Sequence, residues 1–127
     1  MSQNTDLIDR FVAAWKRKKV DEIMSFFHDD AVYINIPMEP ANEGKEAIRK
    51  TIEGFVGMAQ AIDFVVHHTA ENPAAGIVMN ERTDRFQMGG KWIEARVMGV
   101  FEIRGGKIQA WRDYFDLAEF QSQMSGG

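Results

Sequence analysis

The stretch from Trp111 to Asp116, WRDYFD, sets a charged pair, Arg112 and Asp113, among large aromatic side chains. A carboxylate in such surroundings loses hydration, which is costly unless another group pairs with it. Asp113 is therefore either exposed or held for a purpose such as proton transfer. Neighbouring side chains of a strand point to opposite faces, so Arg112 and Asp113 are not each other's partners. The sequence assigns no role to Arg112.

Two further stretches carry polar side chains on a shared strand face. In AVYINIP, alternation puts Tyr33 and Asn35 on one side of the strand, and in NERTDRF it does the same for Arg82 and Asp84. These groups could bind a ligand or move protons. They could equally be a surface ion pair, which would contribute little to stability, and polar residues at a rim. Asp113 could likewise be a bend residue, and periodicity alone does not decide.

The elements that must position these residues follow from the apolar spacing. After Thr5, the expected N-cap, apolar residues recur every three or four positions, which predicts a first helix. A second, short helix is expected over residues 20–27, and a third begins near Gly44. Between them, AVYINIP alternates as a two-faced strand that Pro37 ends.

The second half of the chain has the pattern of a sheet. Strands are expected over residues 61–69, 77–87, 92–104 and 107–115, the last two joined by a Gly105-Gly106 hairpin turn. A short helix then opens at Asp116, with Glu119 three residues later as a capping-box partner. Helices followed by a curved sheet predict an α+β domain, in which the cavity lies between the helices and the sheet face that they cover.

Composition narrows the class of protein. A chain of 127 residues is long enough for one core and too short for two, so a single domain over residues 1–127 is expected. The net charge of −4 and the lack of a basic patch argue against nucleic-acid binding. There is no cysteine, which removes disulfides, thiolate nucleophiles and cysteine-bound metals.

The types of residue present also bear on localisation and metal binding. The first residues lack a basic start and an apolar run, and no segment reaches the roughly 18 apolar residues of a membrane span, so a cytoplasmic protein is expected. The three histidines are His28, His67 and His68. The adjacent pair should face opposite ways on a strand, so we expect no shared metal site.

Taken together, these motifs resemble the limonene epoxide hydrolase family, part of the superfamily that includes nuclear-transport-factor-like and ketosteroid-isomerase-like proteins. The resemblance rests on YINIP, on ERTD and on GVFEIRGGKI leading into WRDYFDLAEF, and its order and spacing hold from about Asp6 to Phe120. It implies a cone-shaped, curved mixed sheet wrapped by the N-terminal helices, with a deep apolar pocket. It also implies a cofactor-independent enzyme that opens an epoxide with water in one step, and a homodimer.

The resemblance assigns roles to five residues. Asp113, Tyr33 and Asn35 would hold the attacking water, with Asp113 as general base. Asp84 would be the general acid that protonates the epoxide oxygen, and Arg82 would bind both carboxylates. Removing and delivering protons in one step avoids both a poor nucleophile and a poor leaving group. One arginine fully compensates only one negative charge, which suits a pair with one ionised and one protonated member.

The family pattern also implies the substrate. The expected partner is a small apolar epoxide, cyclic, terpene-like or aromatic, together with water. The expected pocket-lining residues are Val56, Phe86, Ala95, Val97 and Phe120.

Two other functions remain open at this level. A ketosteroid-isomerase-like or polyketide-cyclase-like enzyme would move protons on a carbonyl substrate, but it would want a carboxylate near the end of the first strand, where this chain has Asn35. A non-catalytic ligand-binding module of the same fold is the second alternative, because fold alone proves no function.

Overall fold

The computed structural model describes residues 2–38 and 40–125, so the outermost residues of the expected domain lie outside the described part. The helices are α1 (Gln3–Arg17), α2 (Val20–Met24), α3 (Lys45–Met58) and α4 (Leu117–Met124). The strands are β1 (Phe27–Asn35), β2 (Asn42–Glu43), β3 (Ala61–Asn72), β4 (Ile77–Met88), β5 (Lys91–Arg104) and β6 (Lys107–Tyr114).

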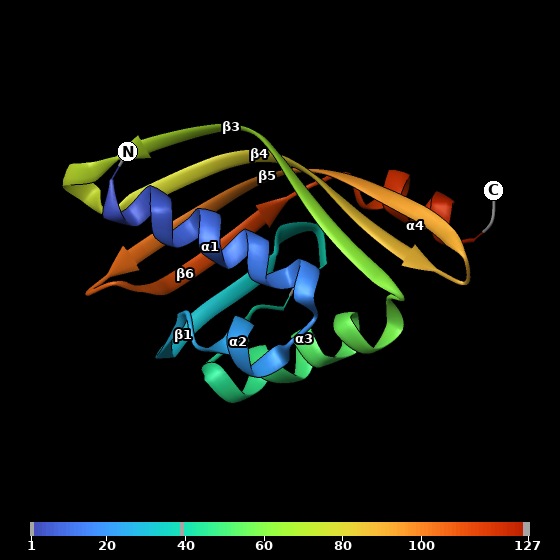
Figure 1. Ribbon diagram of the computed structural model, residues 1–127, viewed down its shortest axis with the longest axis horizontal. Helices are drawn as coiled ribbons and strands as arrows, with labels where there is room; N and C mark the ends of the chain where they lie inside the picture. Colours follow the sequence, from blue (N-terminus) through green and yellow to red (C-terminus); the bar gives the residue numbers. More distant parts are fainter. Residues whose placement is uncertain (1, 39, 126–127) are drawn as a thin grey trace.

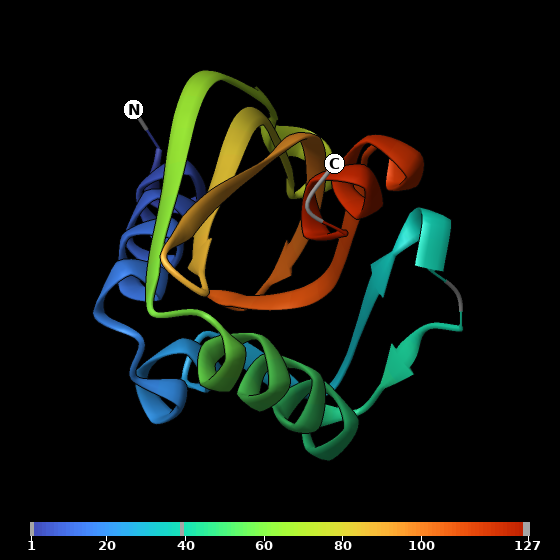
Figure 2. The same ribbon diagram turned by 90° about the vertical axis from the view of Figure 1, so that its right-hand side faces the viewer.

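The six strands form one mixed sheet in the order β2-β1-β6-β5-β4-β3. Only β1 and β6 run parallel within this sheet; the other neighbouring strands are antiparallel. The sheet curls around an interior that α1 and α3 close from its open side (Figures 1 and 2). The prediction of an α+β fold with a curved mixed sheet and helices is therefore confirmed.

The first helix starts earlier than expected. Ser2, not Thr5, is the N-cap, because the Ser2 hydroxyl accepts from the Thr5 amide at 3.1 Å and the Thr5 hydroxyl accepts from the Ser2 amide at 3.0 Å. Thr5 thus occupies the third helical position of a capping box. Ser and Thr both serve at this end of a helix, so residue type alone could not separate the two positions.

The second helix and the first strand also differ from the expectation. α2 ends at Met24, not at residue 27, because Phe27 already pairs with Ile108 of β6 as the first residue of β1. The strands of the second half begin within one residue of their expected positions and end up to three residues away from them. Asp116 caps α4 as expected, but the Glu119 side chain binds Arg96 on β5 and does not reach back to the cap.

The β5–β6 hairpin depends on its two glycines. Gly105 and Gly106 have φ of 58° and 76°, the left-handed region that two-residue hairpin turns require. The turn therefore sets the register of β5 against β6 beside it, and a β-bulge between Glu102 and Ile103 shifts that register further along the two strands. Among the described residues, no helix is long and apolar enough to cross a membrane.

The core is centred on Phe11 of α1, which has no exposed surface. Its ring makes edge-to-face contacts with five others at centroid distances of 5.0 to 6.2 Å: Trp15, Phe26, Phe27, Phe101 and Trp111. Aromatic pairs of this kind stabilise beyond their buried area. Phe11 therefore joins the helix layer to both central strands of the sheet.

Phe11→Ala should lower the free energy of unfolding by about 3–5 kcal/mol, because it removes a buried ring that the neighbours cannot replace. Urea unfolding followed by circular dichroism measures the change. Met58→Ala is the matched control: Met58 is 58% exposed at the end of α3, so its truncation should stay within about 0.5 kcal/mol. A loss below about 1 kcal/mol for Phe11→Ala would contradict the central position given to this ring.

Candidate active site

Strand register brings distant polar residues into one row on the covered face of the sheet. Asn35 on β1 lies opposite Asp113 on β6, Asp113 lies opposite Gly99 on β5, and Gly99 lies opposite Asn80 on β4. The row therefore crosses four strands. Because side chains on one face repeat every second residue, Arg82 and Asp84 continue the same face along β4.

Arg82 connects the groups of this face. Its Nε and one terminal nitrogen donate to the two oxygens of Asp84, both at 2.9 Å. The same terminal nitrogen donates to Asp113 Oδ2 at 2.8 Å, and the other terminal nitrogen donates to Asn80 Oδ1 at 2.8 Å. Only 1% of Arg82 is exposed. A buried guanidinium is tolerated here because its donors meet charged or amide acceptors in good geometry.

Asp113 has a further partner on its own strand. The indole nitrogen of Trp111 donates to Asp113 Oδ1 at 2.7 Å, so each oxygen of the carboxylate accepts one hydrogen bond. The Trp111 ring is itself held between Tyr33, stacked at a centroid distance of 4.1 Å, and Phe101, stacked at 5.5 Å. Trp111 therefore acts as a positioning residue that fixes the orientation of Asp113.

Gly99 leaves the space that this network crosses. A Cβ atom at Gly99 would lie 2.3 Å from a terminal nitrogen of Arg82 and 2.8 Å from Asp113 Oδ1. Contacts this short do not occur, so any side chain at residue 99 would have to displace the ion pair. Because Gly99 on β5 has no side chain, Arg82 on β4 can reach Asp113 on β6.

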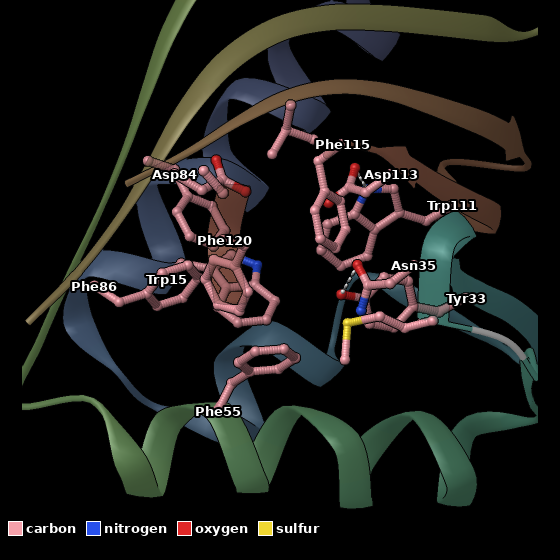
Figure 3. Close-up of a pocket in the computed structure, with 14 residues that line it drawn as sticks. Trp15, Tyr33, Asn35, Phe55, Asp84, Phe86, Trp111, Asp113, Phe115 and Phe120 are labelled. Atoms are coloured by element: carbon pink, nitrogen blue, oxygen red, sulfur yellow. Dashed lines mark hydrogen bonds between the residues drawn. The ribbon is translucent and has the colours of Figure 1, made fainter. Parts of the chain in front are cut away.

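Tyr33 and Asn35 complete the polar group. The Tyr33 hydroxyl donates to Asn35 Oδ1 at 3.2 Å, and both residues line the same pocket as Asp84 and Asp113 (Figure 3). Burial, followed by the nearby Asp113 charge, raises the pKa of Tyr33 well above its usual value. Tyr33 therefore stays protonated and can serve as a donor.

The two carboxylates of the site share one nearby cation, Arg82. Burial raises the pKa of Asp113 to about 6; the Arg82 charge opposes this rise and the Asp84 charge adds to it. For Arg82, burial alone would lower the pKa, but Asp113 and Asp84 together raise it above its ordinary value. Arg82 therefore remains a cation, whereas the two carboxylates compete for its single charge.

The pocket beside these groups is walled mainly by aromatic side chains. Its cavity volume is about 40 Å³. Of the expected apolar lining residues, Phe86, Ala95, Val97 and Phe120 line the pocket. Val56 does not: its neighbour Phe55 does, because consecutive residues of α3 point about 100° apart. Arg82 lies behind the carboxylates and not on the pocket wall.

Several lining residues were not singled out in the sequence. They are Trp15, Met38, Phe55, Phe64, Trp111 and Phe115. Trp111 and Phe115 could have been found from their shared strand face with Asp113. Trp15 and Phe55 belong to helical stripes, in which core and pocket residues have the same spacing.

On the other face of the sheet, Arg112 donates to Glu102 at 2.6 Å, which gives it a structural partner away from the pocket. His67 and His68 do not alternate as expected, because a β-bulge interrupts the register of β3 between Val66 and His68. Both histidines border one hollow on this face. Within the described part of the chain, no three His, Asp or Glu side chains lie close enough to hold a metal ion.

Comparisons with known families, sequences and structures agree with one another on the family of this chain. Residues 2–125 match the family described as the limonene-1,2-epoxide hydrolase catalytic domain. The epoxide hydrolase EphG of Mycobacterium tuberculosis is 30% identical over 122 residues, 94% of this chain and 78% of that protein. A solved M. tuberculosis epoxide hydrolase described as LEH-like superposes with a TM-score of 0.84 at 25% identity, covering 98% of this chain and 91% of that one.

The fold itself is shared more widely. A solved Shewanella putrefaciens protein that is described as a SnoaL-like polyketide cyclase has a TM-score of 0.84 at 14% identity, covering the whole of this chain and 99% of that one. At that identity the likeness concerns the fold alone. The arrangement of the polar residues must therefore carry any argument about chemistry.

Gly99→Ala should lower the free energy of unfolding by about 1–3 kcal/mol, because the new methyl group overpacks the Arg82–Asp113 contact. Gly54→Ala in α3 is the control: Gly54 is exposed, nothing lies within 4 Å of the place that its new methyl group would take, and alanine favours a helix, so this variant should be slightly more stable. Urea unfolding compares both with the wild type. A Gly99→Ala protein as stable as the wild type would refute the crossing described for β5.

Proposed function

Because the chain belongs to the limonene-1,2-epoxide hydrolase family, we propose that residues 1–127 form a single catalytic domain that adds water to an apolar epoxide and releases a vicinal diol. The observation that carries this proposal is the pair of carboxylates, Asp84 and Asp113, which line one apolar pocket and are bound by one buried arginine. Such a pair can take up a proton at one end of a reacting molecule and deliver one at the other.

In the proposed reaction, Asp113 accepts a proton from a water molecule that Tyr33 and Asn35 orient. The water oxygen forms a bond to one epoxide carbon while the carbon–oxygen bond of the ring breaks. Asp84 gives its proton to the departing oxygen, so no free alkoxide forms. The products are the diol, a protonated Asp113 and an ionised Asp84. Transfer of one proton back from Asp113 to Asp84 restores the starting state.

Arg82 suits both the state before the chemical step and the state after it. One carboxylate is ionised before the chemical step and the other after it, and Arg82 is hydrogen-bonded to both. The guanidinium therefore faces a negative charge throughout without moving, and such preorganisation avoids a reorganisation cost during the reaction. A pKa of about 6 for Asp113 leaves the base ionised near neutral pH yet able to accept a proton.

The proposed substrate is a small, largely apolar epoxide. Phe55, Phe86, Phe115 and Phe120 supply rings that exclude bulk water and pack against a hydrocarbon skeleton. Ala95 is small and leaves room on the β5 side of the pocket. The catalytic steps use only side chains of this chain and water, so we propose that the reaction needs no cofactor. We also propose a homodimer, which the molar mass in solution tests.

Asp113→Asn and Asp84→Asn should each lower turnover of a panel of cyclic and aromatic epoxides by at least about 100-fold, because each removes one proton transfer. Diol formation by purified protein, with folding checked by circular dichroism, is the measurement. Asp63→Asn is the control: Asp63 lies on β3 beside Arg85 at the surface, and this variant should keep full activity.

Isotopically labelled water distinguishes the mechanism in the same assay. Direct attack places the label in the diol during a single turnover and leaves the enzyme carboxylates unlabelled. Label in Asp84 or Asp113 would contradict direct attack, and full activity in either Asn variant would overturn the role of that residue. Conversion of a β,γ-unsaturated ketone without any epoxide turnover would favour an isomerase.

A further inference from the structure

Trp15, which lines the pocket, carries a buried hydrogen-bond donor that has no partner among the described residues. Among the described residues, three buried side-chain polar atoms have no partner: Trp15 Nε1, Asn80 Nδ2 and Gln109 Oε1. Trp15 lines the pocket, whereas Asn80 and Gln109 do not. Figure 3 shows the Trp15 indole among the pocket side chains, on the side of Asp84 and Phe86 and across from Trp111.

An unpaired indole N–H at this place is costly. Trp15 is only 1% exposed, so bulk water does not reach the nitrogen. A buried donor without a partner loses its hydrogen bond to water and gains none in the protein. Buried tryptophan nitrogens therefore usually have a partner. The contrast with Trp111 is direct, because the Trp111 nitrogen donates to Asp113 at 2.7 Å. A phenylalanine would fill much of the same space without a polar atom.

The Trp15 ring is held firmly enough to select a ligand. It packs at 5.0 Å from Phe64 and 5.8 Å from Trp111 between ring centroids, and it meets Phe11 at 6.2 Å. These contacts come from α1, β3 and β6, so the indole cannot turn its nitrogen elsewhere without disturbing three elements. The donor direction is thus built into the packing of the fold.

We propose that Trp15 is a specificity-determining residue whose indole N–H donates to a neutral oxygen of the substrate, away from the reacting ring. This inference rests on the proposed epoxide hydrolysis and names its substrate class: an apolar epoxide that also carries one carbonyl or ether oxygen. A plain hydrocarbon epoxide would leave the indole donor unpaired.

The surrounding charges decide which oxygen fits. Two carboxylates and one arginine give the pocket no excess of positive charge, so an anionic oxygen would be repelled by Asp84 and Asp113. A hydroxyl would bring its own O–H donor, which would compete with water and epoxide for the same carboxylates. A carbonyl or ether oxygen only accepts, and an indole nitrogen only donates. The two are complementary without any further group.

Two epoxides of nearly equal shape test this directly. One is cyclohexene oxide that carries an acetyl group, and the other carries an isopropenyl group at the same ring carbon, so that an oxygen is exchanged for a methylene. The wild type should show a kcat/KM about tenfold higher for the acetyl compound. Trp15→Phe should bring the ratio of the two kcat/KM values close to one. Trp92→Phe is the matched control and should keep the wild-type ratio, because Trp92 is 38% exposed and lies outside the pocket.

Nuclear magnetic resonance of wild-type protein gives a readout that does not depend on turnover or on the folding of a variant. The Trp15 indole N–H signal, assigned through its own backbone, should move downfield on titration with acetylcyclohexane and not with isopropenylcyclohexane. A Trp15 signal that responds equally to both compounds, or to neither, would overturn the inference.

The outcomes separate the inference from the function on which it rests. Diol from both epoxides at equal efficiency, or an equal loss on both in Trp15→Phe, would leave the hydrolase proposal standing and contradict the role of Trp15. No diol from any epoxide would sink the proposed function, and the inference would fall with it.

Discussion

The guanidinium of Arg82 binds two buried carboxylates that come from different strands. Strand order, register and packing elsewhere in the protein are all needed for this contact. A buried cation with two buried anions is costly unless every donor and acceptor is paired. The pairing depends on the order of the strands, since β5 lies between Arg82 on β4 and Asp113 on β6. It also depends on Gly99, because a side chain there would occupy the path between them. The two ion pairs of Arg82, the register of the strands and the lack of a side chain at Gly99 therefore depend on one another.

The aromatic core extends this constraint to the helices. Phe11 of α1 contacts Trp111, and Trp111 both stacks on Tyr33 and donates to Asp113. Packing and the polar site are therefore not separate layers. The same ring that fills the core sets the orientation of one carboxylate, so residues far from the pocket can influence its chemistry through Trp111.

Much of this arrangement could be predicted from the sequence, and the rest could not for physical reasons. Alternation within a strand correctly separated Arg112 from Asp113, because side-chain direction is a local property. The family resemblance suggested that Arg82 binds Asp84 and Asp113, but the contact across β5 depends on strand order, which local patterns do not contain. Gly99 lies within the expected strand over residues 92–104, and no sequence pattern marks it, since its importance lies in the Arg82–Asp113 contact that crosses it.

The structure departs from the expected placement of residues where local patterns are ambiguous or interrupted. Val56 and Phe55 are neighbours on α3, and the apolar stripe is too broad to show which of them reaches the pocket. His67 and His68 were expected on opposite faces, but a β-bulge breaks the alternation and cannot be read from residue types. The unpaired nitrogen of Trp15 is likewise invisible in a helical pattern, where the residue appears only as part of the buried stripe.

The central claim is that Asp84 and Asp113 compete for one cation and so act as a coupled acid–base pair. The most direct measurement is the titration of the Asp113 carboxyl carbon by nuclear magnetic resonance, in the wild type and in Asp84→Asn. The account predicts a pKa of about 6 in the wild type and a clearly lower pKa in the variant, because the Asp84 charge contributes to the rise and Arg82 would then serve Asp113 alone. An unchanged Asp113 pKa in Asp84→Asn would contradict the coupling.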